Sequence, residues 1–181
     1  MGSRVWPSIP ERFTAGDGRE MRLVTAQDAA AIEAALPEGQ RAETFHFFTV
    51  RPFPLAEFIA DPAKRTYALW SGEQPADRPL ACTTVYNTDE DAGSVMLGYT
   101  WVMPDARGRG GAANRDLKSA MYRVLGEAGV REVWFRADVE NLRSCRSMEK
   151  NGAERMHEED APRVYPDRTS RSVFYRRRLS S

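Results

Sequence analysis

The chain contains few of the residues that build metal sites and disulfide frameworks. Its 181 residues include two cysteines and two histidines. Cys82 and Cys145 form no CxxC or other pair with ligand spacing, and His46 and His157 lie far apart in the sequence. We therefore expect no structural zinc site, no disulfide framework and no bound metal ion.

Long hydrophobic runs and an excess of charge of either sign are also missing. No stretch approaches the roughly eighteen apolar residues of a membrane span, and the N-terminal sequence MGSRVWPSIPERF has no apolar signal-peptide core. The 26 basic and 26 acidic residues cancel, and the pI is near 6.8. The sequence thus predicts a cytoplasmic protein whose partners include neither nucleic acid nor a membrane.

Lysine is the third scarce residue type. Among the 26 basic residues only Lys64, Lys118 and Lys150 are lysines. Arginine supplies the rest, which indicates a bias of coding composition, and on this ground we assign no function to the lysines.

What is present suffices for one compact domain. A chain of 181 residues with 41% hydrophobic side chains can bury roughly 70% of the surface that its unfolded form exposes. We expect a single domain over residues 1–181, in which residues 1–18 form an N-terminal extension. No internal repeat or low-complexity segment divides the chain.

Hydrophobic periodicity predicts the order of helices and strands. The sequence at 25–28, TAQD, resembles a capping sequence that opens a helix, and Gly129 and Gly152 are placed to end two others. The expected strands are 21–25, 67–70, 80–86, 94–102, 133–137, 153–157 and 172–178, and the expected helices are 29–36, 55–60, 113–128 and 141–150. This order predicts a mixed α/β fold (α+β) with a mostly antiparallel sheet.

Gly98 is unusual inside the expected strand 94–102. A glycine in a strand interior has no side chain to pack, and it often marks a bulge or a close approach of a ligand to the backbone. We therefore expect an irregularity of the sheet at this position.

A glycine-rich segment, PDARGRGGA at 104–112, joins this strand to the helix 113–128. Unpaired N–H groups at the helix start, together with the positive end of the helix dipole, make an anion site suited to a pyrophosphate. Arg107 and Arg109 can add charge-assisted contacts. An ordinary flexible loop between a strand and a helix would explain the same glycines.

Two other phosphate-binding loops compete for this segment. A P-loop needs a Lys-Ser or Lys-Thr pair after its last glycine, and Ala112 and Ala113 stand there instead. The Rossmann pattern GxGxxA fits residues 108–113, with Asp138 near the end of the following strand. The preceding meander and the few residues that follow argue against a doubly wound sheet.

Two motifs, one at 107–112 and one at 141–153, resemble motifs of the GNAT N-acetyltransferases, in particular of the branch of ribosomal-protein N-terminal acetyltransferases. The sequence RGRGGA at 107–112 is similar to that family's acetyl-CoA pyrophosphate loop, R/Q-x-x-G-x-G/A. The sequence NLRSCRSMEKNGA at 141–153 resembles the second cofactor-side motif of the branch. LGYTWV at 97–102 resembles the strand that precedes the loop. The resemblance extends from about residue 20 to the end.

The resemblance implies a sheet of six to seven strands with helices on both faces, and acetyl-CoA as co-substrate without a metal ion. In this family the central fourth and fifth strands splay apart at a bulge, and the pantetheine arm of acetyl-CoA enters the gap. Gly98 lies in the strand that would carry this bulge. Free amides near residues 99–103 would bind pantetheine or polarise the thioester carbonyl as an oxyanion hole.

Carried onto this chain, the family motifs imply a set of cofactor-binding residues. These are Trp101, Val102, Met103, Arg107, Gly108, Arg109, Gly110, Gly111, Ala112, Ala113, Asn114, Asn141 and Ser144. Asn141 would reach the pantetheine or the 3′-phosphate side of the cofactor. It also fits a plain helix N-cap, and the two roles are compatible.

Acetyl transfer requires an uncharged amine and a proton donor for the departing coenzyme A thiolate. Many family members carry a tyrosine seven residues after the motif asparagine, where this chain has Met148. In the branch resembled here a serine of this helix can serve as the catalytic acid, which implicates Ser144 and, as second choice, Ser147. Ser144 equally fits a serine that satisfies amides at the helix start.

The acceptor side carries no comparable motif. The aromatic segment 43–54 and the strand 94–102 suggest four substrate-binding residues: Glu43, Phe45, Phe47 and Tyr99. No residue is assigned as the base, because the acidic turn 89–91 fits a solvated loop and His46 and His157 are isolated.

The acceptor is a small-molecule amine or a protein N-terminus, and the sequence distinguishes neither these two nor acetyl from a larger acyl group. An edge strand near the C-terminus would allow a homodimer. The sequence therefore indicates an acetyl-CoA-dependent N-acetyltransferase that acts on a primary amine by direct attack in a ternary complex. The alternatives are a non-catalytic coenzyme A-binding sensor, which the missing tyrosine permits, and a nucleotide-dependent oxidoreductase that uses the loop 108–113.

Overall fold

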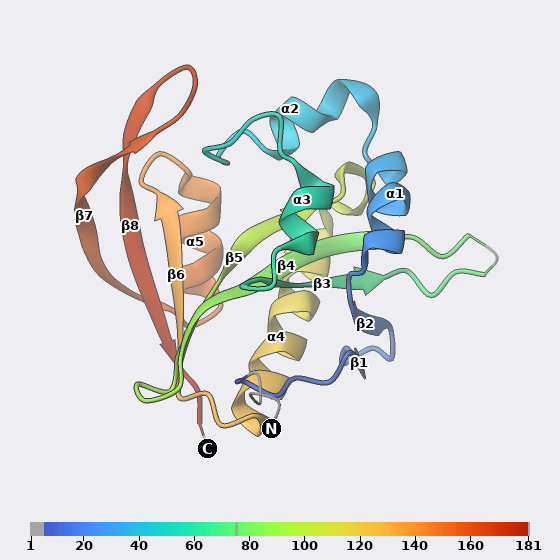
Figure 1. Cartoon of the computed structure of the whole chain (residues 1–181), viewed down its shortest axis with the longest axis horizontal. Helices are drawn as coiled ribbons and strands as arrows, with labels where there is room; N and C mark the ends of the chain where they lie inside the picture. Colours follow the sequence, from blue (N-terminus) through green and yellow to red (C-terminus); the bar gives the residue numbers. More distant parts are fainter. Residues whose placement is uncertain (1–5, 75, 181) are drawn as a thin grey trace.

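The computed structural model describes residues 6–74 and 76–180, and within them one sheet of eight strands forms the centre of the molecule (Figure 1). The strands are β1 (Arg12–Thr14), β2 (Glu20–Leu23), β3 (Arg65–Trp70), β4 (Pro79–Asp89), β5 (Ser94–Val102), β6 (Glu132–Asp138), β7 (Glu154–Val164) and β8 (Thr169–Arg178). Their spatial order is β1-β2-β3-β4-β5-β6-β8-β7. Neighbouring strands run antiparallel except for the parallel pair β5 and β6, which confirms the predicted mostly antiparallel sheet.

Helices cover both faces of the sheet. They are α1 (Ala26–Ala35), α2 (Arg41–Thr44), α3 (Leu55–Ala60), α4 (Ala112–Glu127) and α5 (Leu142–Lys150). In Figure 1 the first three lie in front of the sheet, and α4 and α5 lie behind it. No helix in the described part of the chain is both long and apolar enough to cross a membrane.

The alternation of side chains along each strand divides the core into two clusters. Leu97 of β5 packs in the cluster that contains Leu117 and Met121 of α4. Trp101, further along β5, lies in the other cluster, with Phe58 of α3. The β5 strand therefore contributes to both cores, and its middle is where the side chains change faces.

Most helices begin and end where the sequence predicts. Asp28 accepts a hydrogen bond from the Thr25 amide at 2.9 Å and completes the predicted capping box of α1. One strand more than the six to seven expected is present, because β1 forms inside residues 1–18 and pairs with β2. A strand of three residues is too short to show an alternating pattern in the sequence.

The last two strands are longer than their hydrophobic patterns predict. We expected strands at 153–157 and 172–178, whereas β7 spans Glu154–Val164 and β8 spans Thr169–Arg178. Every residue of β7 is exposed or half-buried, since this strand forms the outer edge of the sheet. A strand without a buried face carries no alternation of apolar residues, so periodicity underestimates its length.

The expected irregularity is a β-bulge in the middle of β5. The pairing with β4 passes from Cys82–Trp101 directly to Thr84–Gly98, so Thr83 alone opposes two residues of β5. Tyr99 takes up the bulge with φ of 48°, a backbone conformation that costs a residue with a side chain roughly 1–2 kcal/mol. Gly98 serves close approach instead, because a Cβ there would lie 3.1 Å from the Tyr86 hydroxyl.

The bulge coincides with a divergence of the two parallel strands. β5 pairs with β6 only from Ser94–Glu132 to Met96–Trp134, and beyond this point the strands separate, as Figure 1 shows. The backbone of β5 from Leu97 to Val102 therefore has a partner strand on its β4 side alone. We call the space between these two segments the splay.

Candidate active site

The glycine-rich loop between β5 and α4 is shaped entirely by its backbone. Gly108, Gly110 and Gly111 adopt φ of 96°, 67° and 76°, values that favour glycine. No other atom lies within 4 Å of the place where a Cβ would project from any of the three. The loop is thus open on its outer side, and a side chain at these positions would occupy that space.

This open loop leads into the N-terminus of α4, a helix of 16 residues. Within residues 6–74 and 76–180 no side chain caps its first turn, so the N–H groups at its start are not satisfied by a described side chain. Those groups and the helix dipole suit an anion, and the absence of side chains lets a diphosphate approach the backbone. The residues present therefore fit the pyrophosphate of a coenzyme A thioester.

We expected the guanidinium of Arg107 to point at this loop, but in the structure it points elsewhere. Its Nη2 donates to the Thr44 hydroxyl at 2.7 Å, and its Nη1 lies 3.3 Å from a carboxylate oxygen of Glu43. Its Nε donates to the Val102 carbonyl at 3.1 Å. Arg107 thus ties the start of the loop to α2, and Glu43 is held there as its ion-pair partner.

The end of β5 offers fewer free groups than the sequence predicts. Trp101 is 3% exposed, and its side chain packs in the aromatic cluster in front of the sheet. The Met103 amide donates to the Leu80 carbonyl at 2.8 Å, so the expected free amide at this residue is wrong. The β5 backbone that faces the splay therefore runs from Leu97 to Val102 and does not include Met103.

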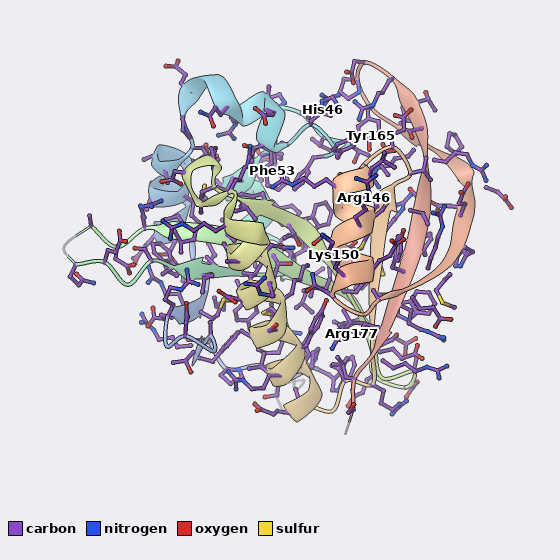
Figure 2. All side chains as sticks on the ribbon, turned by 180° about the vertical axis from the view of Figure 1, so that it is seen from behind. His46, Phe53, Arg146, Lys150, Tyr165 and Arg177 are labelled. Carbon is purple, nitrogen blue, oxygen red and sulfur yellow. The ribbon has the colours of Figure 1, made fainter. Side chains whose placement is uncertain are left out.

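Two predicted site residues of α5 have clearly different roles. The Asn141 side chain accepts from the Ser144 amide at 3.1 Å, which is the helix N-cap that the sequence allowed. Ser147 accepts a hydrogen bond from the Asn114 side-chain amide at 2.8 Å. That bond links α5 to the first turn of α4, the two helices that lie side by side in Figure 2. The Ser147 hydroxyl keeps its own proton free to donate.

In front of the sheet an aromatic cluster fills the space beneath α2 and α3. Its members are Phe45, Phe48, Phe53, Phe58, Tyr99 and Trp101. The Tyr99 ring lies 4.8 Å from the ring of Phe58 and 5.7 Å from that of Phe48. Phe45 is only 2% exposed, so its main role is to pack in the core. Phe47 lies apart from this cluster and packs against Arg168.

The end of β7 and the loop between β7 and β8 are fastened to the same aromatic segment. Arg163 donates to the Phe47 carbonyl at 2.9 Å, and Arg51 forms an ion pair with Asp167. We call the place where residues 45–53 and 163–168 meet the acceptor mouth, because the sequence predicts the acceptor at the aromatic segment 43–54. Figure 2 labels His46 and Tyr165, one on each of these two segments.

Asp138 anchors the acceptor mouth from the end of β6. It is 1% exposed, and it accepts hydrogen bonds from the hydroxyls of Tyr165 and Ser170 and from the Glu140 amide. Burial acts to raise the pKa of Asp138, but these hydrogen bonds outweigh it and hold the pKa below its usual value. The Rossmann interpretation needed this carboxylate free for a ribose, and the structure gives it a structural role.

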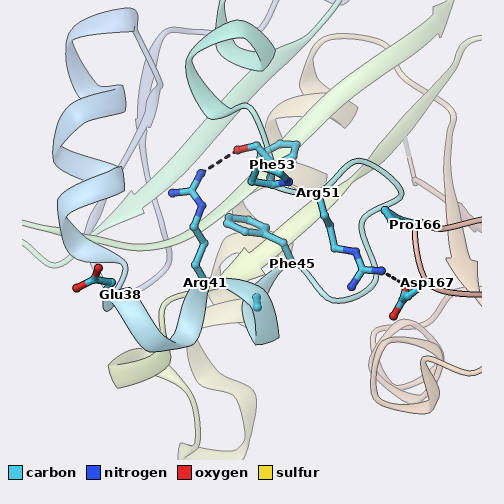
Figure 3. A pocket seen from close by; sticks show the side chains of 9 residues that line it. Glu38, Arg41, Phe45, Arg51, Phe53, Pro166 and Asp167 are labelled. Carbon is cyan, nitrogen blue, oxygen red and sulfur yellow. Dashed lines mark hydrogen bonds and ion pairs between the residues drawn. The ribbon is translucent and has the colours of Figure 1, made fainter.

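A pocket of about 530 Å³ opens on the outer side of the acceptor mouth (Figure 3). Arg41 and Arg51 line it together with Phe45, and both arginines are engaged, with the Phe53 carbonyl and with Asp167. The Phe45 ring lies 5.5 Å from Trp101. One aromatic ring therefore separates this pocket from β5.

One functional candidate was missed by the sequence analysis. Lys118 of α4 is 7% exposed and donates to the hydroxyls of Thr100 and Thr83 beside the bulge. Burial lowers the pKa of Lys118 to about 7. The sequence did carry a signal for this residue, because a lysine next to Leu117 interrupts the apolar face of α4. Among the described residues, no group of three histidine, cysteine or acidic side chains could hold a metal ion.

Comparisons with known proteins agree with this geometry. The family model of the acetyltransferase (GNAT) domain matches residues 13–154. A protein from T. thermophilus described as an acetyltransferase shares 21% identity over 95% of this chain and 91% of its own, with a TM-score of 0.77. A GCN5-related N-acetyltransferase from Brucella melitensis shares 17% identity over 94% of this chain and 80% of its own, with a TM-score of 0.77.

A third similar structure is the spermidine N-acetyltransferase from Vibrio cholerae in complex with CoA and spermine. It shares 13% identity over 88% of this chain and 94% of its own, with a TM-score of 0.70. At these identities the likeness shows a common fold. No curated protein matches the sequence.

Proposed function

The chain belongs to the GNAT acetyltransferase family and is an acyltransferase, and on that premise we propose that it uses acetyl-CoA to acetylate a primary amine. The observation that carries this proposal is the junction of two features, the open glycine loop at the start of α4 and the splay beside it. The loop suits a diphosphate, and the unpaired edge of β5 suits the amide groups of a pantetheine arm. One extended thioester would satisfy both.

The cofactor would lie along the chain's own backbone donors. Gly108, Gly110 and Gly111 leave room for the diphosphate, and the first N–H groups of α4, from Ala112 to Asn114, would donate to it. The bound thioester supplies an activated acetyl group. Amides of β5 near Tyr99 and Thr100 would hold the thioester carbonyl, where negative charge develops during attack.

Ser147 is the acid that this geometry favours over Ser144. The nitrogen of the acceptor attacks the thioester carbon and releases one proton to water, the carbon–sulfur bond breaks, and the sulfur needs a proton to leave as a thiol. Ser147 receives a hydrogen bond from Asn114 at 2.8 Å, which orients its hydroxyl between α4 and α5. The Ser144 amide is held by the Asn141 cap at the beginning of the helix. Met148, in the position of the family's tyrosine, is 9% exposed and has no proton to give.

The acceptor amine would enter through the acceptor mouth. Tyr99 joins the two sides of the site, because its backbone forms the bulge and its ring packs in the aromatic cluster. Small amines and peptide N-termini are both acceptors of the class we propose. Glu43 is 74% exposed at its side chain and paired with Arg107, so we assign it to binding rather than to proton transfer.

The competing function is a coenzyme A-binding sensor without turnover, and the buried Met148 favours it. The test is release of free coenzyme A thiol from acetyl-CoA in the presence of polyamines, amino acids, drug-like amines and peptides with free N-termini. Our proposal predicts thiol release that depends on one acceptor class, and mass spectrometry should show that acceptor 42 Da heavier, roughly the mass of an added acetyl group. Tight binding of acetyl-CoA without turnover for any acceptor would favour the sensor.

A further inference from the structure

Lys118 breaks the pattern of the helix that carries it. It occupies the middle of α4, whose buried face is otherwise built from small and apolar side chains such as Leu117 and Met121. Lysine is almost never fully buried unless it is paired, yet Lys118 is 7% exposed. A helix position of this kind would be more stable with an apolar residue, so the lysine needs an explanation.

Its ammonium group contacts the two threonines on either side of the bulge. Lys118 Nζ lies 2.8 Å from the Thr100 hydroxyl on β5 and 3.2 Å from the Thr83 hydroxyl on β4. The two hydroxyls are themselves 2.8 Å apart. Thr83 is the single residue that opposes the bulge, and its hydroxyl also lies 3.4 Å from the Gly98 carbonyl. Three side chains therefore close a hydrogen-bonded ring around the irregular part of β5.

No opposite charge accompanies this ammonium. Within the part of the chain that the structure describes, no carboxylate lies within 4.0 Å of Lys118. The groups that face it are the Thr83 hydroxyl from β4, the Thr100 hydroxyl from β5 and the Phe135 ring from β6, whose centroid is 5.3 Å away. Its charge is therefore held by neutral hydroxyls and an aromatic ring, and burial alone lowers its pKa.

The position of these partners places the ammonium at the beginning of the splay. Phe135 is the first residue of β6 after the parallel pairing ends at Trp134. Thr100 lies in the bulge of β5 on the opposite side of the gap. Lys118 thus bridges from α4 to the point where the two strands separate, behind the backbone that our proposed function assigns to the thioester.

We propose that Lys118 is a positioning residue for acyl transfer, which with Thr83 and Thr100 clamps the β5 bulge so that the backbone at Tyr99 stays aligned with the thioester. This inference rests on the proposed function. Tyr99 holds a positive φ that a tyrosine does not adopt readily, and packing on its ring holds it from the front alone. The lysine and the two threonines hold the same backbone from the back. Loss of the clamp would let β5 relax toward a regular ladder and move the groups that bind the thioester carbonyl.

The test is a set of matched variants on both sides of the clamp. Lys118→Met removes the ammonium with little change in length, and Leu117→Met places the same side chain at the neighbouring buried position as a control. Thr100→Val removes one hydroxyl at constant shape, and Thr100→Ser retains it. We expect Lys118→Met and Thr100→Val to lower kcat by roughly tenfold or more, with the acetyl-CoA Kd within about twofold of the wild type, because misalignment affects the reacting atoms more than remote binding.

Three further results separate positioning from a merely structural role. Thermal stability of Lys118→Met should stay equal or rise while kcat falls, Thr100→Ser should have a higher kcat than Thr100→Val, and Leu117→Met should keep wild-type kcat. The double variant Lys118→Met/Thr100→Val should be no slower than the slower single variant, since both break one ring. A kcat of Lys118→Met and Thr100→Val within about twofold of the wild type would overturn the inference.

A readout that needs no turnover keeps the inference separate from the proposed function. Hydrogen–deuterium exchange of the segment 97–102 should be faster in Lys118→Met and in Thr100→Val than in the wild type, and unchanged in Thr100→Ser. Wild-type protein that neither binds acetyl-CoA nor releases its thiol would refute the proposed function, and exchange would still test the clamp. Unchanged exchange in both variants would refute the clamp even if the enzyme is active.

Discussion

The two sides of the site are built in opposite ways. In the proposed site, the cofactor side consists of a loop whose three glycines have open space above them, followed by a helix start that no described side chain caps. The acceptor side is filled by aromatic rings and fastened by contacts such as the hydrogen bond from Arg163 to the Phe47 carbonyl, which joins residues 116 apart in the sequence. One side offers bare backbone, and the other is made of side chains from distant segments.

This difference explains what each side can recognise. Backbone N–H groups bind a diphosphate in any protein that presents them in this arrangement, so the cofactor side serves the part of the reaction that the family shares. The acceptor side recognises its ligand through the identities of side chains, which differ from protein to protein. We therefore expect substitutions on the cofactor side to act on acetyl-CoA and those at the acceptor mouth to act on the amine.

The largest effect should come from filling the open loop. Gly110→Val places a branched side chain where φ is 67° and where the diphosphate would lie. We expect the Kd for acetyl-CoA to rise by more than about 100-fold, because both the amide geometry and the space are lost. Calorimetric titration measures this directly. Gly72→Val is a matched control, since Gly72 has a φ of 73° and open space in a loop outside the site. Equal affinity in Gly110→Val and the wild type would contradict the loop assignment.

Removal of the proposed acid should be the next largest effect. Ser147→Ala is expected to lower kcat by roughly 100-fold and to leave the KM for acetyl-CoA nearly unchanged, since a proton donor acts on the leaving thiolate. Ser144→Ala should retain most of the activity, because the helix cap there uses the Ser144 amide. Steady-state kinetics of the two variants at saturating amine decide between them. The reverse order of effects would assign the acid to Ser144.

The buried Lys118 should make the free energy of unfolding depend on pH. Its pKa is about 7 in the folded protein against an ordinary 10.5, so between these values the unfolded chain binds one proton more. Stability should therefore rise with pH from about 7 upward, by up to about 1.4 kcal/mol per pH unit. Denaturant unfolding of the wild type and Lys118→Met at pH 7, 8 and 9 gives the difference between them. The stability advantage of Lys118→Met should shrink as pH rises, and parallel curves would contradict this origin.

The anchor of the acceptor mouth should give a smaller effect. Tyr165→Phe leaves the buried Asp138 carboxylate one hydrogen bond short, which we expect to cost about 1–2 kcal/mol of stability. The KM for the amine should rise while the Kd for acetyl-CoA stays constant. Because the pKa of Asp138 is lowered, its contribution to stability is present above the unfolded value near 3.8 and disappears as pH falls below it. A change in acetyl-CoA affinity would show that the two sides are coupled.

The smallest expected effect concerns the ion pair across the acceptor mouth. Arg51→Ala removes the partner of Asp167, whose side chain is 56% exposed. An exposed pair of this kind contributes less than about 1 kcal/mol, so the melting temperature should change little. The amine KM should nevertheless change, because the pair spans the proposed entrance. Kinetics with the accepted amine measure this change, and an unaltered KM would place the entrance elsewhere.

The backbone of the glycine loop and the start of α5 could be predicted because their signals are local. Glycines at 108–111 dictate the loop, and Asn141 signals the start of α5, so both motifs can be read within a few residues. The sequence locates the bulge one residue early, since Gly98 is the visible oddity whereas Tyr99 takes the positive φ.

The side-chain partners could not be predicted. Arg107 turns to Thr44, and Ser147 meets Asn114, through contacts between segments 63 and 33 residues apart. The sequence shows that Lys118 interrupts the apolar face of α4, but the burial of its ammonium group depends on the packing of α4 against the sheet. The Rossmann pattern would make Asp138 a ribose ligand, and only the return of β8 brings Ser170 to it.

The most direct test of the account is a thermal-shift panel with acetyl-CoA, coenzyme A, NAD, NADP and ATP at matched concentrations, on the wild type and on Gly110→Val. A ligand at one hundred times its Kd adds about 2.7 kcal/mol, or roughly 5–11 °C for a chain of this size. The account predicts a shift of the wild type with acetyl-CoA and coenzyme A alone, and no shift of Gly110→Val with either. A shift with NAD or NADP only, or an equal shift of both proteins with acetyl-CoA, would contradict it.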